Sequence, residues 1–207
     1  MPLISLEELY KVIVFWVIFF ITPGPVWIAV MEATRKLTVL NIWTFFIRVF
    51  FPVNIIIQFT QAIICVVFIQ FVSQFFSHIG LMFYVLGGMY ILYIAYKAFK
   101  SKQTNASFSL SFWNLAVVML LSPKIWLLFP SGAVIANNLS NSLVINSLVF
   151  GVLMLLVSSI MFMLYVLIGK VGTKLLADNF SYLASGLLLL FALFLFNEAF
   201  IIATTQT

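Results

Sequence analysis

The chain has 207 residues, of which 65% are hydrophobic and only 7% are charged, and its formal net charge is +5. A soluble domain has about 45–50% apolar and about 25% charged residues, so this composition excludes a water-soluble fold. Continuous apolar runs without period-two alternation exclude a β-barrel and predict an all-α polytopic membrane protein.

The first predicted span covers about Leu9–Met31 and contains Thr22-Pro23-Gly24-Pro25. Proline removes a backbone donor and clashes with the preceding turn, and glycine is easily unwound, so the helix is expected to break there. The break would free the carbonyls of residues such as Phe19, Phe20 and Ile21. Irregular backbone survives at membrane depth only where it is buried in protein or lines a wet cavity, so a simple kink and a binding site are the two interpretations.

The second predicted span covers about Asn41–Phe71, and Pro52 is expected to bend it. Asn54, Gln58 and Gln61 are spaced by four and three residues, so they share one face of this helix. These amides either line a transport path or hydrogen-bond the helix to its neighbours, and the sequence favours neither. The single cysteine, Cys65, lies in the same span and is expected to be a free thiol.

The remaining spans follow from the apolar runs. Residues 77–80 are predicted to form a turn before the third span, and residues 100–111 a hydrophilic loop that separates two halves of about 1–100 and 101–207. Residues 169–179 are predicted to be a loop before the last span. The third to sixth spans are expected at about Leu81–Phe99, Phe112–Ala136, Leu143–Ile168 and Tyr182–Ala203.

The positive charges predict an orientation. One set of loops carries most of the cations, whereas the opposite side has only Lys11, offset by Glu7 and Glu8. Cytoplasmic loops are enriched in lysine and arginine, so the first set is expected in the cytoplasm and both termini outside. The cytoplasmic set is Arg35, Lys36, Lys97, Lys100, Lys102, Lys170 and Lys174.

Two short sequence features recur at matching positions of the two halves. Thr22-Pro23 is repeated as Ser122-Pro123 after 100 residues, and Gly88 as Gly186 after 98. Each half contains three spans, so the second half would enter the membrane upside down. This pattern predicts two inverted three-helix repeats, the architecture of many secondary transporters, in which broken helices at matching positions mark the binding site.

Lys124 is the most informative charge, because it lies near the middle of the fourth span. A cation at that depth costs at least about 2.5–3.5 kcal/mol, so it is expected to face the bundle interior. Its ammonium is predicted to pair either with a substrate carboxylate or with the carbonyls freed at the break. The predicted substrate site comprises Thr22, Pro23, Gly24, Pro25, Asn54, Gln58, Ser122, Pro123 and Lys124.

The acidic residues do not identify a coupling group. Glu32 ends the first span and Glu198 lies late in the sixth, and neither is predicted at the midplane. One cysteine and one histidine cannot form a metal cluster, and no catalytic triad or carboxylate pair is recognisable. We therefore expect no enzyme activity, no cofactor and no nucleic-acid partner.

Three motifs in order resemble the LysE/RhtB superfamily of bacterial amino-acid exporters (LysE family translocators). They are Thr22–Pro25, the run Leu86–Lys97, and Leu121-Ser122-Pro123-Lys124 followed by Phe129-Pro130. The resemblance implies six helices in the bacterial inner membrane and export of amino acids or related zwitterionic metabolites. The chain is expected to be embedded in membrane lipid. A homodimer is one expected oligomeric state, because many such carriers form dimers.

The chain also departs from the pattern of this family. Thr38, Asn41, Arg48 and Pro52 stand where glycines are usual, and Ser122 stands where asparagine is usual. The alternative hypothesis is therefore a membrane scaffold or assembly partner that kept the fold and lost transport. A lipid-modifying enzyme ranks lowest, because catalytic groups are missing.

Overall fold

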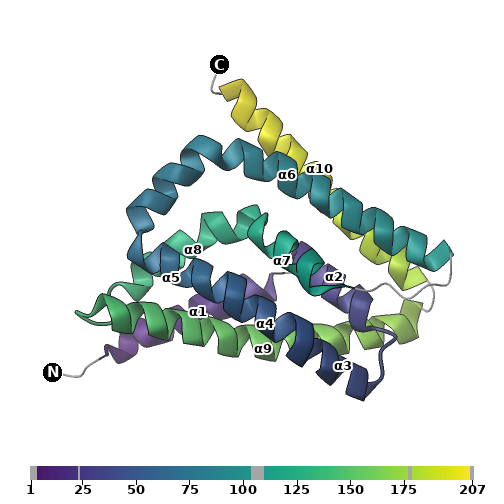
Figure 1. Cartoon of the computed structure of the whole chain (residues 1–207), viewed down its shortest axis with the longest axis horizontal. Helices are drawn as coiled ribbons and strands as arrows, with labels where there is room; N and C mark the ends of the chain where they lie inside the picture. The colour runs from purple at the N-terminus through teal and green to yellow at the C-terminus, as the bar shows by residue number, and fades with distance from the viewer. Residues whose placement is uncertain (1–3, 23, 104–109, 177–178, 206–207) are drawn as a thin grey trace.

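The computed structural model describes residues 4–22, 24–103, 110–176 and 179–205 (Figure 1). The regular structure of these residues is helical, so the expected all-α class is confirmed for them. Two segments, η1 and η2, are π-helical. The elements are α1 (Leu6–Ile21), α2 (Pro25–Thr34), α3 (Val39–Phe45), η1 (Phe46–Phe50), α4 (Phe51–Val53), η2 (Asn54–Phe59), α5 (Thr60–Val67), α6 (Ile69–Gln103), α7 (Phe112–Leu120), α8 (Pro123–Ala136), α9 (Leu143–Leu176) and α10 (Phe180–Thr205).

Four to six segments of the described chain are candidate membrane spans. Two more helix pairs pass the same test of length and hydropathy only when each pair is taken together: α1 with α2, bent by 63°, and α7 with α8, bent by 62°. Several apolar helices of this kind are compatible with a multi-pass membrane protein. The four single spans are Val39–Val67, Leu81–Lys100, Leu143–Gly172 and Tyr182–Ile201.

The two bends have the same local cause. Thr22 has φ −73° and ψ 110°, and Ser122 has φ −73° and ψ 109°, so both residues are extended. Each precedes a proline, whose ring disfavours the α conformation in the residue before it. The following helices begin at Pro25 and Pro123, where the missing N–H costs nothing. The helix breaks therefore occur where the sequence predicts them.

Pro52 is accommodated differently. The span Val39–Val67 continues past it, with π-helical turns on either side at η1 and η2. Proline lacks the N–H that an α-helix needs at this position, and π turns rearrange the backbone hydrogen bonds around it. The disturbance in this span is therefore a widening of the helix rather than a break.

Two predicted connections are wrong. The turn expected at residues 77–80 lies inside α6, and the break precedes it at Phe68, whose φ is −119° and ψ 38°. Residues 169–176 were expected in a loop but continue α9. Hydropathy limits only the stretch that fits the hydrocarbon core, whereas polar residues and single glycines prolong a helix at a cost of no more than about 1 kcal/mol each.

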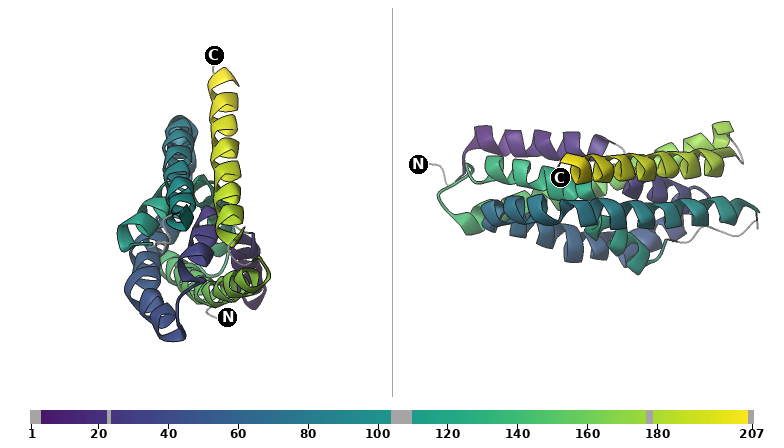
Figure 2. Two further views of the ribbon diagram at one scale, coloured as in Figure 1. Left: turned by 90° about the vertical axis from the view of Figure 1, so that its right-hand side faces the viewer. Right: turned by 90° about the horizontal axis from the view of Figure 1, so that it is seen from above.

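The helices form two layers. α6 and α10 pack along each other and lie to one side of the bundle formed by the other helices (Figures 1 and 2). Counterparts of the predicted repeat touch one another: α1 contacts α8, α5 contacts α9, and α6 contacts α10. The inverted repeat itself stays a prediction.

The loops gather at two ends of the bundle. At one end, the Ser5 N–H donates to the carbonyl of Leu139 at 2.9 Å, which joins the N-terminal segment to the α8–α9 connection. At the other end, the Lys170 ammonium donates to the carbonyl of Leu37 at 2.9 Å, which joins the end of α9 to the α2–α3 connection (Figure 1). Connections predicted to share a side of the membrane are therefore joined in these two cases.

Candidate functional site

The first helix break is held by Lys124. Its Nζ donates to the carbonyls of Phe19 at 2.6 Å and of Thr22 at 2.8 Å, and lies 4.4 Å from the centre of the Phe19 ring. The last carbonyls of a helix have no partner within the helix, and an ammonium offers three donors. In the structure, Lys124 thus contacts the freed carbonyls, which are one of the two partners that the sequence predicts for it.

Tyr165 of α9 serves the remaining carbonyls of the same break. Its hydroxyl lies 3.2 Å from the carbonyl oxygen of Phe20 and 3.0 Å from that of Ile21. Its ring stacks on Trp27 of α2, with centroids 4.7 Å apart and planes at 12°. Tyr165 is not predicted from the sequence, because a tyrosine within a long apolar run gives no signal that separates it from a packing residue.

The second break is also served by a side chain. The Trp126 indole N–H donates to the carbonyl of Leu120 at 2.8 Å. Gly87 of α6 packs directly against Leu121, the residue that follows Leu120. A Cβ added to Gly87 would lie 2.6 Å from the carbonyl oxygen of Leu121. Only glycine lets the α6 backbone approach the break this closely.

An inner cavity of about 30 Å³ lies between the two breaks. This volume accommodates about one or two water molecules. Four of the predicted site residues line it from the breaks, and Gln58 joins them from η2. The lining also includes Trp27, Phe50 and other apolar side chains, and the predicted residues among it are Gly24, Pro25, Gln58, Ser122 and Lys124.

A larger groove of about 490 Å³ shares Pro25, Ser122 and Lys124 with the lining of the inner cavity. Apolar side chains of α6, α8 and α10, such as Ile91, Leu127 and Phe194, form most of its wall. Lys124 thus borders both the inner cavity and the groove. The predicted site residues that line the groove are Thr22, Pro25, Ser122, Pro123 and Lys124.

The remaining two predicted site residues are Pro23 and Asn54. Pro23 lies outside the described residues. Asn54 is buried one turn before Gln58 but lines neither cavity.

Three amides of the second span are buried without a hydrogen-bond partner in the described residues. Asn54, Gln58 and Gln61 have exposed fractions of 0%, 4% and 3%. The unpartnered atoms are Asn54 Nδ2 and Oδ1, Gln58 Oε1, and Gln61 Nε2 and Oε1. An unsatisfied buried polar group costs about 1–3 kcal/mol. The interpretation that these amides bond the helix to its neighbours is therefore not supported.

A buried ion pair ends α2. Arg35 Nε lies 2.7 Å from Glu32 Oε2, and the two side chains are only 4% and 1% exposed. Arg35 follows the end of α2, in the connection where the sequence places it, but its side chain is buried because α2 is enclosed along nearly its whole length; its use as an orientation signal stays a prediction. The sequence signal for this ion pair is the three-residue spacing of Glu32 and Arg35 at a helix end. At this spacing the carboxylate can pair with the guanidinium when both are buried.

The site has the chemistry of binding. It combines an ammonium, the exposed ends of a broken helix and a neutral amide, all between apolar walls. Within the described residues, no three histidine, cysteine or acidic side chains gather as metal ligands. Comparisons of the chain with protein-family models, with curated proteins and with solved structures find no match.

Proposed function

We propose that this chain is a secondary transporter of the LysE/RhtB type that exports amino acids or related small zwitterionic metabolites across the bacterial inner membrane. The observation that carries the proposal is the pair of broken helices, bent by 63° and 62°, which face each other across Lys124 and the inner cavity. Broken helices at matching positions form the substrate sites of many inverted-repeat transporters.

The contacts of Lys124 favour a zwitterion as the substrate. Its ammonium is engaged by the carbonyls of Phe19 and Thr22, so a carboxylate can take the ammonium only if those carbonyls find another donor. The ammonium group of a zwitterion supplies that donor while its carboxylate pairs with Lys124. The exchange leaves no buried group unpaired, which is the condition for low-cost binding in an apolar site.

In this proposal, alternating access comes from movement of one half of the chain against the other. Rocking of α1–α6 against α7–α10 would separate the two breaks and open the inner cavity, in the manner of other inverted-repeat carriers. Lys124 would then hold the two halves together in the closed state, because it lies on α8 and its two carbonyl partners lie in the first half.

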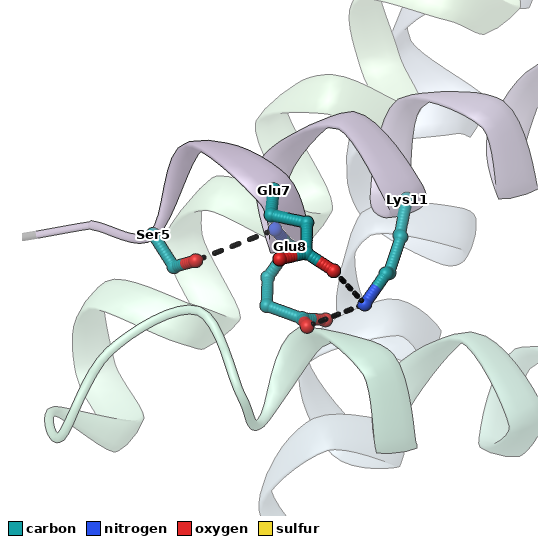
Figure 3. Close-up of polar contacts among 4 residues, drawn as sticks. All are labelled: Ser5, Glu7, Glu8 and Lys11. Atoms are coloured by element: carbon teal, nitrogen blue, oxygen red, sulfur yellow. Dashed lines mark hydrogen bonds and ion pairs between the residues drawn. The ribbon is translucent and has the colours of Figure 1, made fainter.

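Efflux from vesicles loaded with a mixture of labelled amino acids tests the proposal. Wild type is compared with Lys124→Met and with Lys11→Met at matched membrane levels. Lys11 is a suitable control, because it also binds two oxygens, those of Glu7 at 2.7 Å and Glu8 at 2.8 Å, but on the exposed start of α1 (Figure 3). We expect selective efflux of one or a few amino acids by wild type and Lys11→Met, and its loss in Lys124→Met.

The second candidate is a membrane scaffold. It is favoured by the small inner cavity and by the carbonyl partners of Lys124, because both suit a residue that only holds the break together. In that case wild type releases no more label than empty membranes, with or without a proton gradient. That result would contradict amino-acid export.

A further inference from the structure

The unpartnered amides belong to one continuous face of the second span. Asn54, Gln58, Gln61 and Cys65 follow at spacings of four, three and four residues, so they lie on one side of the helix. All four are buried. The face extends over about 16 Å at about 1.5 Å per residue, and Gln58 opens into the inner cavity beside Lys124.

We propose that this amide face is a hydrated track, which begins at Asn54, passes the inner cavity at Gln58 and leads past Gln61 to the end of the bundle that holds the N-terminal segment. The role of the track as the exit route of the transported compound rests on the proposed function. Its hydration is a physical property of the protein and is measurable without transport.

The hydrogen bonds supply the first argument. A buried amide that joins helices has partners on the neighbouring helix, but five amide atoms of Asn54, Gln58 and Gln61 have none in the described part of the chain. Such groups are retained in a bilayer-spanning helix where water or a passing solute supplies the partner. Gln58, which is 4% exposed, lines the cavity, and its side-chain oxygen is one of these atoms.

The backbone supplies the second argument. Asn54 and Gln58 lie in the π-helical segment η2. π turns are uncommon, and they occur frequently at functional sites, because they redirect side chains and weaken the regular hydrogen-bond ladder. Gln58, which lines the cavity, and Asn54 are therefore carried by an irregular part of this span.

The far end of the track meets the loop that follows α8. Asn137 Nδ2 donates to the carbonyl of Val66 at 3.3 Å, one residue beyond Cys65, and Asn137 Oδ1 is another buried atom without a partner. Asn146 continues the polar contacts by donating to the carbonyl of Asn137 at 3.2 Å. On the orientation expected from the charges, this end faces the outside.

The chemistry of the track defines the class of solute. Amides are neutral and both donate and accept hydrogen bonds, so they replace the hydration shell of a polar solute without adding a net charge to the track. The solute that fits is small, net-neutral and rich in hydrogen-bonding groups. A zwitterionic amino acid with a polar or small side chain meets these conditions, whereas a metal ion does not.

Thiol labelling in native membranes tests the hydration. Single cysteines are introduced by Asn54→Cys, Gln61→Cys and Val53→Cys in a Cys65→Ala background, and a charged, water-soluble methanethiosulfonate is added. Val53 is the matched control, because it is fully buried beside Asn54 but is not three or four residues from any member of the amide face. We expect labelling at 54 and 61 on the order of tenfold faster than at 53, since thiol reactivity follows access. Equal rates at the three positions would overturn the track.

Apolar replacement tests the role of the same side chains. Gln61→Leu and Asn54→Leu remove amides that have no partner, so the melting temperature in detergent is expected to stay the same or rise, while efflux falls. A lower melting temperature in both variants would show that the amides hold the helices together and would overturn the track. If wild type shows no efflux but the labelling pattern holds, the proposed transport fails and the track stands.

Discussion

At the scale of single residues, the first break is a set of carbonyls served by side chains from distant parts of the chain. Lys124 and Tyr165 together reach four consecutive carbonyls, those of Phe19, Phe20, Ile21 and Thr22. An unwound helix end in an apolar bundle is stable only when such partners exist. The two side chains therefore contribute to stability whether or not the break also binds a substrate.

Tyr165→Phe isolates the hydroxyl, because the ring that stacks on Trp27 is kept. The loss of the donor leaves the buried carbonyl of Phe20 unsatisfied, and we expect the free energy of unfolding to fall by about 1–3 kcal/mol. Denaturant unfolding in detergent micelles measures the change. Tyr10→Phe, on the exposed face of α1, is the control and is expected to leave stability unchanged. Equal stability of wild type and Tyr165→Phe would mean that water replaces the hydroxyl.

At the scale of helices, the close approach of α6 to the second break depends on one missing side chain. The carbonyl oxygen of Leu121 occupies the place that a side chain at Gly87 would need. Gly186, which the sequence analysis paired with Gly88 as a repeat mark, has no atom within 4 Å of an added Cβ. Glycines of similar appearance in the sequence thus have different roles, one in packing and one without a steric requirement.

Gly87→Ala is expected to push α6 away from the α7–α8 break and to lower the free energy of unfolding by about 1–3 kcal/mol, as overpacking does. Gly186→Ala is the matched control on α10. It adds the same methyl group in open space, so it is expected to raise stability by about 0.5–1 kcal/mol through the better helix propensity of alanine. Thermal unfolding of both variants in one detergent compares them. A stable Gly87→Ala would contradict the tight contact at Leu121.

At the scale of the whole molecule, the number of membrane crossings depends on the two bent pairs. If both cross, the chain has six spans, and the two ends of each pair lie on opposite sides of the membrane. If both are re-entrant, only four helices cross and the two ends share a side. Because six and four are both even numbers, the positions of the two termini do not distinguish the arrangements.

Cysteine labelling of intact cells distinguishes them. Glu7→Cys and Lys36→Cys, in a Cys65→Ala background, place exposed thiols at the two ends of the first bent pair. With six spans and the expected orientation, an impermeant maleimide labels position 7 in intact cells and position 36 only after permeabilisation. Trp113→Cys and Asn138→Cys apply the same test to the second pair. Labelling of positions 7 and 36 from the same side would contradict six crossings.

The sequence by itself determined the helical class and the positions of both breaks. Pro23 and Pro123 act on their immediate neighbours through ring sterics and a missing N–H, so Thr22 and Ser122 become extended whatever the surroundings. The ends of α6 and α9 were mispredicted, because hydropathy marks the limits of a bilayer and not those of a helix.

The tertiary structure alone decided which groups meet at the breaks. The contacts of Lys124 with Phe19 and of Tyr165 with Phe20 join residues more than a hundred positions apart, and the burial of Arg35 depends on the helices that enclose α2. The amide face was visible as a spacing, but whether its members are bonded or open depends on what neighbouring helices present to them. Local rules act through the chain, whereas the partners of a side chain are set by packing between segments that the chain order does not bring together.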